Sequence, residues 1–324
     1  MKARSFLVIV ALLVLGVFMV MPSSSSAAGY PDHPIQLIIP YVAGATGDIT
    51  ARMLAEELEK NINGKIVPNN RPGAGTVLGA DAAARAKKDG YTLFYGGASP
   101  MIYAPISNPE VVKYDASKDF DPIGFHFFFP TVIGVKADAP WKNFNEFIDY
   151  AKKNPGKIRM TSIGVGSSTH FAIEMLSSIT GAKFTHVPFE GGETVITAVL
   201  GGHVEATLDG FGKLKPHVEA GRMRILLVDP KKPDYPNIPT LKELGYKQNL
   251  PATWFALWGP AGLPDDVKRV LIPATEKAVK ATKARIDALG SICDYKSPAD
   301  LKKLRDDEYK QMYEIAVRIG LRKQ

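Results

Sequence analysis

Signals for strands and helices alternate along this chain in two separate series, and this alternation restricts the possible fold more than any other feature. The first series starts with an apolar strand pattern at 35–39 and a helical pattern at 48–61. The second starts with a helix after Asn143 and a strand pattern at 158–162. Because β–α–β units place neighbouring strands parallel, each series predicts a mostly parallel sheet with helices on both faces. The chain is therefore expected to be an α/β protein with two lobes.

Two extended segments connect these series. An unusually aromatic stretch at 125–130 leads from the first series into the second, and the run 253–259 has the pattern of a strand that crosses back. We therefore predict lobe 1 from residues 29–128 and 255–324, and lobe 2 from residues 129–254. Lobes joined by two crossing strands can hinge and close a ligand cleft between them.

The N-terminus has the pattern of a secretory signal peptide. Lys2 and Arg4 precede an apolar run at 6–21, and small residues follow it up to Ala28. The alternative is an uncleaved anchor, but the apolar run is shorter than the ~20 residues that a membrane-spanning helix needs. We therefore predict cleavage near Ala28, export to the periplasm and a mature chain of 324 − 28 = 296 residues.

Charge and cysteine content exclude several classes of protein. The net charge is +7, but the basic residues alternate with acidic ones along helical patterns such as 302–305, which favours a solvated surface over a nucleic-acid interface. Cys293 is the single cysteine, so the chain has no internal disulfide and no cysteine-based metal site. The modest basic excess can help to gather anionic solutes without identifying them.

The loop that follows the first strand is the first candidate binding element. Its glycines let a ligand approach the backbone closely, and a helix starts directly after it. A helix N-terminus carries unpaired N–H groups and about half a positive charge, so this element can bind an anion without an arginine. Most loops of this kind bind nothing, so the motif alone is a weak signal. The candidate residues are Tyr41, Val42, Ala43, Gly44, Ala45, Thr46, Gly47 and Asp48.

A second loop in the other lobe repeats this chemistry. A glycine, three hydroxyl side chains and a helix start follow one another, although serine and threonine at such positions often serve only as N-caps. If the lobes face each other, both helix ends point into one cleft. The candidate residues are Gly166, Ser167, Ser168, Thr169 and His170.

No catalytic pattern accompanies these loops. Ser167 and His170 lack the spacing of a Ser-His-Asp arrangement, and no Gly-x-Ser-x-Gly elbow occurs. His170 and His186 can meet in space, but no carboxylate pattern completes a zinc site. The glycines at 73–79 lack the spacing and the acidic residue of a dinucleotide site. We therefore predict a protein that is not an enzyme and has no metal or cofactor, and keep a hydrolase using Ser167 or Ser168 as the enzyme alternative.

Several short motifs, in sequence order and spread over the whole mature chain, resemble the signatures of one family. That family is the Bug-type extracytoplasmic solute receptors, the substrate-binding components of tripartite tricarboxylate transporters. The motifs are Pro40-Tyr41 through Asp48-Ile49 and Ala51-Arg52, the turn at 70–75, Asp89 to Leu93, Tyr114-Asp115 with Lys118 to Phe120, Ser167 to His170, His186 to Phe189 with Gly191, and Leu208-Asp209.

The resemblance implies a two-lobed periplasmic-binding-protein fold of type II. It also implies a monomeric receptor that captures a small organic carboxylate by closing its cleft and delivers it to membrane permease subunits. The ligand class is left open among di- or tricarboxylates, aromatic acids and amino acids, and a same-fold receptor serving a sensor kinase is the alternative. Carried over by position, the pocket candidates are the two loops, Ser99, Phe189 and Asp209. Ala45 stands where the family usually has glycine.

Selectivity among acids is expected to come from side chains beyond the two loops. The candidates by chain position are Tyr41, Tyr103, Phe127, Phe189 and Asp209. An ionised Asp209 in the cleft would repel a second carboxylate and attract a hydrogen-bond donor. The alternative is that Asp209 only caps the turn that it forms with Gly210.

Overall fold

The computed structural model describes residues 29–189 and 192–322, so the predicted signal peptide and Gly191 lie outside the described residues. Sheet A contains β1 (Ile35–Ile39), β2 (Ile66–Asn70), β3 (Thr92–Gly97), β4 (Phe120–Phe129), β10 (Thr253–Pro260) and β11 (Ile292–Cys293) in the order β11-β4-β10-β3-β1-β2. Sheet B contains β5 (Thr131–Lys136), β6 (Arg159–Ser162), β7 (Thr185–Pro188), β8 (Ala206–Gly210) and β9 (Met223–Asp229) in the order β7-β6-β8-β5-β9.

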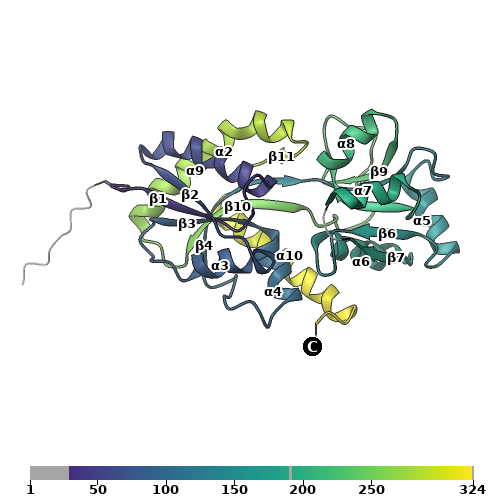
Figure 1. The fold of residues 1–324 in the computed structure, drawn as a ribbon, viewed down its shortest axis with the longest axis horizontal. Helices are drawn as coiled ribbons and strands as arrows, with labels where there is room; N and C mark the ends of the chain where they lie inside the picture. The colour runs from purple at the N-terminus through teal and green to yellow at the C-terminus, as the bar shows by residue number, and fades with distance from the viewer. Residues whose placement is uncertain (1–28, 190–191, 323–324) are drawn as a thin grey trace, which may run out of the picture.

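Each sheet forms one lobe together with its helices (Figure 1). Lobe 1 is built on sheet A and carries α2 (Thr46–Ile62), α3 (Val77–Ala84), α4 (Ala104–Ser107), α9 (Asp265–Ala288) and α10 (Pro298–Arg318), with a 3-10 turn at Ala74–Thr76 and a π-helical turn at Ser99–Tyr103. Lobe 2 is built on sheet B and carries α5 (Phe144–Lys153), α6 (Ser168–Thr180), α7 (Gly192–Leu200) and α8 (Phe211–Glu219). Within the described residues, no helix is long and apolar enough to cross a membrane.

Both sheets are mixed, so the prediction of mostly parallel sheets is wrong. In sheet A, β1 pairs in parallel with β2 and β3, whereas β10 runs antiparallel to both β3 and β4. In sheet B, β6 pairs in parallel with β7 and β8, whereas β5 runs antiparallel to β8 and β9. The antiparallel pairs arise because β4, β5 and β10 carry the chain between the lobes and do not follow a β–α–β crossover.

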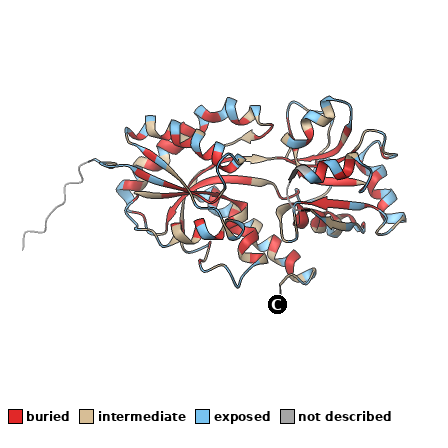
Figure 2. Ribbon diagram, viewed as in Figure 1, coloured by how far each residue is buried: buried red, intermediate tan, exposed pale blue. Residues whose placement is uncertain are grey.

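Helices cover both faces of each sheet, as the sequence predicts. Along β1, Ile35, Leu37 and Ile39 pack into one core cluster, and Ile38 packs into the cluster on the opposite face. This follows from the two-residue period of a strand, and all four side chains are buried because helices cover both faces of sheet A at these positions. Figure 2 shows the same pattern in both lobes, with buried strands inside and exposed outer helix surfaces.

Two neighbouring segments connect the lobes, in agreement with the predicted pair of crossing strands. β4 ends at Phe129 and β5 begins at Thr131, while the return strand β10 begins at Thr253, opposite Phe129. The Thr131 hydroxyl donates a hydrogen bond to the carbonyl of Pro251 at 2.7 Å and so ties the two crossings together. The lobe boundaries at 128/129 and 254/255 stay a prediction.

The lobes also touch along a line that the sequence does not predict. Phe171 and Met175 of α6 belong to a core cluster formed mainly by lobe 1, and Phe171 packs against Tyr103 with ring centroids 5.5 Å apart. Arg318 of α10 bonds the hydroxyl of Ser178, and Ser107 donates to the carbonyl of Gly166 at 3.1 Å. Helix α6 is therefore packed against α10 and the π-helical turn, and the loop before α6 is bonded to α4.

Candidate functional site

A cavity of about 400 Å³ lies between the lobes next to the crossing strands. This volume is in the range of small-molecule sites, and both lobes and both crossings contribute to its walls. The lining residues are Tyr41, Ala45, Thr46, Gly47, Phe129, Thr131, Ile163, Ser168, Thr169, Asp209, Gly210, Gly212, Lys213, Thr253, Phe255 and Leu289.

The N-terminus of α2 forms the lobe 1 side of this cavity. Its N-cap is Ala45, in an extended conformation and without a capping side chain. As a result, the amides of Thr46 and Gly47 have no hydrogen-bond partner among the described residues. A serine or aspartate at this position would accept a bond from the first turn. Alanine leaves these donors available to an anion.

Asp48 holds the first loop together and does not line the cavity. Its carboxylate accepts from the amide of Gly44 at 2.9 Å, from Arg52 at 2.8 Å and from Asn70 at 2.8 Å. Burial opposes ionisation, but these bonds outweigh it and hold the pKa of Asp48 below its usual value. Asn70 also donates to the carbonyl of Tyr41 at 3.0 Å, so both ends of the loop are fixed.

Gly47 is required because the Tyr41 ring lies directly against it. A Cβ on Gly47 would lie 2.3 Å from an atom of that ring. The ring also packs edge-on against Phe255, with centroids 5.5 Å apart. Tyr41 and Phe255 thereby form an aromatic wall beside the free amides of α2.

The N-terminus of α6 forms part of the lobe 2 side. Ser167 is the N-cap: its hydroxyl accepts from the amide of His170 at 3.3 Å and donates to the carbonyl of Gly164 at 2.6 Å. In the part of the chain that the structure describes, the amides of Ser168 and Thr169 have no acceptor. The Ser168 hydroxyl lies 3.3 Å from that of Thr253 on the crossing strand.

His170 and His186 stack behind this helix end with ring centroids 4.1 Å apart. His170 Nδ1 accepts a bond from the amide of Gly166 at 3.0 Å, and His186 Nε2 lies 2.6 Å from the Ser162 hydroxyl. Burial, and then the neighbouring His186, lower the pKa of His170 to about 4. Both histidines support the loop in their neutral forms and do not line the cavity.

Asp209 and Lys213 bring the charged groups into the cavity. The Lys213 ammonium lies 3.1 and 3.3 Å from the two oxygens of Asp209, and the Asp209 carboxylate also accepts from the amide of Gly210 at 2.6 Å. Asp209 therefore both caps its own turn and lines the cavity, and its role in selectivity stays a prediction. Lys213 was missed by sequence reasoning.

The lobes approach each other closely beside this ion pair. A Cβ on Gly212 would lie 2.4 Å from the carbonyl oxygen of Leu289, at the end of α9 in lobe 1. A Cβ on Gly290 would lie 2.8 Å from the Cα of Gly212. Only glycine allows the backbones of α8 and of the turn after α9 to meet at this distance.

The other predicted site residues lie around the cavity without lining it. Val42, Ala43 and Gly44 form the exposed part of the first loop, Ser99 lies 3.4 Å from Thr76, and Phe189 packs against the core cluster under α8. Two of the aromatic candidates for selectivity, Tyr103 and Phe127, are buried in the core of lobe 1. Phe129 and Phe255 line the cavity instead.

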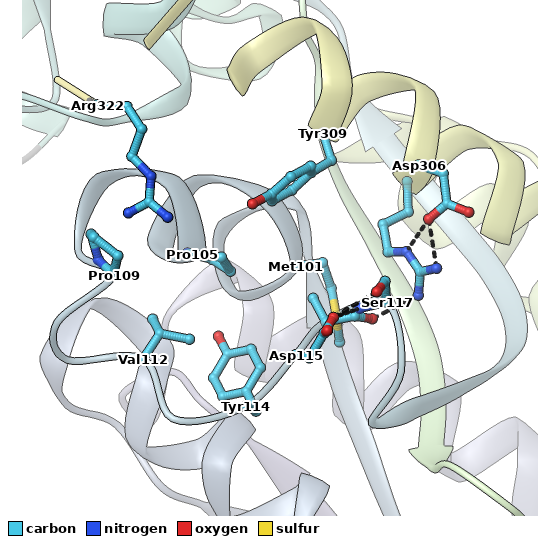
Figure 3. Close-up of a pocket in the computed structure, with 12 residues that line it drawn as sticks. Met101, Pro105, Pro109, Val112, Tyr114, Asp115, Ser117, Asp306, Tyr309 and Arg322 are labelled. Atoms are coloured by element: carbon cyan, nitrogen blue, oxygen red, sulfur yellow. Dashed lines mark hydrogen bonds and ion pairs between the residues drawn. The ribbon is translucent and has the colours of Figure 1, made fainter. Parts of the chain in front are cut away.

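A larger cavity of about 520 Å³ lies in lobe 1, between the loop that follows α4 and helix α10 (Figure 3). Figure 3 shows Tyr114, Asp115 and Ser117 on the loop side and Asp306 and Tyr309 on α10. All of its residues come from lobe 1, so its shape does not depend on how the lobes are placed. The cavity between the lobes is therefore the better candidate for a ligand that controls their closure.

Ser167 and Ser168 are expected to separate a structural role from a binding role. Ser167→Ala should lower the free energy of unfolding by about 1 kcal/mol, because it removes the N-cap. Ser168→Ala should leave stability nearly unchanged and weaken ligand binding by about 1 kcal/mol, because its hydroxyl lines the cavity. Urea unfolding and calorimetric titration of each variant measure the two effects. The opposite assignment would show that Ser168 supports the fold.

Two facing α/β lobes, joined by two crossings and enclosing a cavity with a helix N-terminus from each lobe, define a two-lobed solute-binding receptor. Residues 50–321 match the model of the family described as the tripartite tricarboxylate transporter family receptor, and the chain belongs to this family. The resemblance predicted from the motifs is thereby confirmed.

Similar proteins agree with this assignment. The chain is 29% identical to Protein BugT of Bordetella pertussis over 86% of this chain and 87% of that protein. A crystal structure of a TctC solute binding protein from Polaromonas, without ligand, is 28% identical with a TM-score of 0.81, covering 89% of this chain and 99% of that one. An R. palustris protein determined with adipate is 25% identical with a TM-score of 0.72, covering 90% and 98%. The predicted fold class is thereby confirmed.

Proposed function

We propose that this receptor is exported to the periplasm, binds a small organic carboxylate in the cavity between its lobes, and delivers it to the membrane subunits of a tripartite tricarboxylate-type transporter. The observation that carries the proposal is the pair of helix ends, one from each lobe, whose unpaired amides line one cavity. A carboxylate that accepts bonds from both ends links the lobes and favours their closure. The adipate in the R. palustris relative supports this ligand class.

The contacts of the two serines argue against a hydrolase. Ser167 donates to the carbonyl of Gly164, and Ser168 lies next to Thr253. The acceptor nitrogen of His170 is occupied by the amide of Gly166, and its other ring nitrogen lies 3.9 Å from Glu174. Neither serine has a histidine placed to remove its proton.

The sensor-kinase alternative concerns the partner protein and not the cavity. The same ligand experiment therefore applies to a receptor for a transporter and to a receptor for a sensor kinase.

A thermal-shift screen tests the proposed function. Mono-, di- and tricarboxylates, aromatic acids and amino acids are added separately to the purified mature protein, and the same samples with methyl esters are analysed for hydrolysis. We expect at least one free acid to raise the melting temperature, since a ligand that binds only the folded state stabilises it by mass action. Ester turnover, or a screen in which no acid raises the melting temperature, would contradict the proposal.

A further inference from the structure

Two charged side chains, Asp209 and Lys213, occur among the described residues that line the cavity. They already form an ion pair, with the ammonium 3.1 Å from one carboxylate oxygen. Asp209 is 4% exposed and is also bonded by the amide of Gly210, whereas the Lys213 side chain is 43% exposed. Asp209 and Lys213 together therefore add no net charge to the cavity. The buried Asp209 carboxylate is held in place, whereas the Lys213 side chain is partly exposed.

The remaining positive potential comes from helix ends. Those of α2 and α6 each offer two unpaired amides, and each helix end is equivalent to about half a positive charge. At the start of α8, the amide of the N-cap Gly210 donates to Asp209, and the amide of Phe211 donates to the carbonyl of Pro130 at 2.8 Å. The ends of α2 and α6 together thus offer about one unit of positive charge, which matches one carboxylate.

The ion pair enters the cavity from a different side than the free amides of α6. Helix α8 packs on one face of sheet B through Phe211 and Leu214, and α6 packs on the other through Ile173 and Leu176. Figure 1 shows these two helices on opposite sides of lobe 2. A ligand whose carboxylate binds at the helix ends therefore places a different group against Asp209 and Lys213.

We propose that this receptor selects monocarboxylates that carry an uncharged hydrogen-bonding group, such as a carboxamide or hydroxyl, at the end that meets Asp209 and Lys213, and that it rejects dicarboxylates of the same length. The proposal rests on the proposed function. A carboxamide can donate to Asp209 and accept from Lys213 without disturbing the pair. A second ligand carboxylate at this end would have to share Lys213 with the buried Asp209. The ligand carboxylate and the Asp209 carboxylate would then lie close together and repel each other.

Matched pairs of ligands and variants test this selection. Adipate is compared with its monoamide adipamate, and terephthalate with 4-carbamoylbenzoate, by calorimetric titration at pH 7.5. Each pair has the same length and differs by one charge. The variants are Asp209→Asn, which removes the negative charge beside Lys213, and Lys213→Gln, which removes the positive charge beside Asp209. Lys215→Gln is the control, because it removes the same charge from the same helix at a residue that pairs with Glu219 outside the cavity.

We expect the wild type to bind the monoamide of at least one pair at least tenfold more tightly than the diacid. Asp209→Asn should shift the ratio of monoamide affinity to diacid affinity at least tenfold toward the diacid. Lys213→Gln should shift this ratio further toward the monoamide, and Lys215→Gln should leave it unchanged. The proposal is overturned if the wild type prefers the diacids or if Asp209→Asn leaves the affinity ratio unchanged. It is also overturned if the wild type binds other acids in the screen but none of the four test compounds. A screen that finds no acid ligand at all overturns the proposed function itself.

Discussion

Replacing Gly212 with valine should weaken ligand binding by at least about tenfold while each lobe stays folded. A side chain at this position would overlap the carbonyl of Leu289 at 2.4 Å, and backbone atoms cannot move aside as a flexible side chain can. The variant should therefore hold α8 away from the end of α9 and reduce the fraction of molecules that can close. Apparent affinity falls in proportion to that fraction.

Calorimetric titration of Gly212→Val with an acid from the screen measures this effect, and small-angle scattering of the ligand-bound protein reports whether the lobes close. Ala220→Val is the matched control, because it adds a larger side chain at the exposed far end of the same helix. Normal affinity and a compact ligand-bound form in Gly212→Val would show that closure does not use this contact.

Glu308 should make the stability of this protein fall as the pH rises through neutrality. Its carboxylate accepts from the indole N–H of Trp254 at 2.7 Å and from the Tyr103 hydroxyl at 2.9 Å. Burial raises the pKa of Glu308 to about 7 against these two bonds. Between its ordinary value of 4.5 and about 7, the folded state holds a proton that the unfolded state has lost, so the protonated form stabilises the fold.

Glu308→Gln imitates the protonated form and should remove this dependence. Relative to wild type, the variant should gain up to about 3 kcal/mol in free energy of unfolding between pH 4.5 and pH 8.5. The comparison cancels the effect of His126, His170 and His186, because their lowered pKa values destabilise the fold on acidification in both proteins alike. Urea unfolding at both pH values measures it, with the exposed Glu314→Gln as control on the same helix. An equal difference at both pH values would show that Glu308 titrates normally.

The two binding loops could be predicted because their signals are local. A strand, a glycine-bearing loop and a helix start follow one another within a few residues at 39–48 and again at 162–170, and hydroxyl caps mark the second helix. The two crossing strands were also predictable, since their aromatic residues form long extended runs. These features depend on short-range propensity and do not require knowledge of how strands pair.

The parts that were not predicted depend on pairing or on weak local signals. Nothing in β10 indicates that it lies antiparallel between β3 and β4, and Phe127 and Phe129 are equally apolar although only Phe129 lines the cavity. Helix α8 was missed because it contains Gly212 and Pro216, both poor helix formers. With that helix missed, the i, i+4 spacing of Asp209 and Lys213 carried no meaning. Had α8 been predicted, this spacing would have indicated an ion pair.

A calorimetric titration of the tightest-binding monocarboxylate from the screen, compared with its methyl ester and its amide, shows whether the helix ends recognise the charge of the ligand. If the free amides of α2 and α6 hold the carboxylate, removal of the negative charge should cost on the order of 3 kcal/mol of binding free energy, because charge-assisted hydrogen bonds are replaced by neutral ones. Equal affinity for the acid and its ester would instead show that the helix ends do not recognise the charge of the ligand.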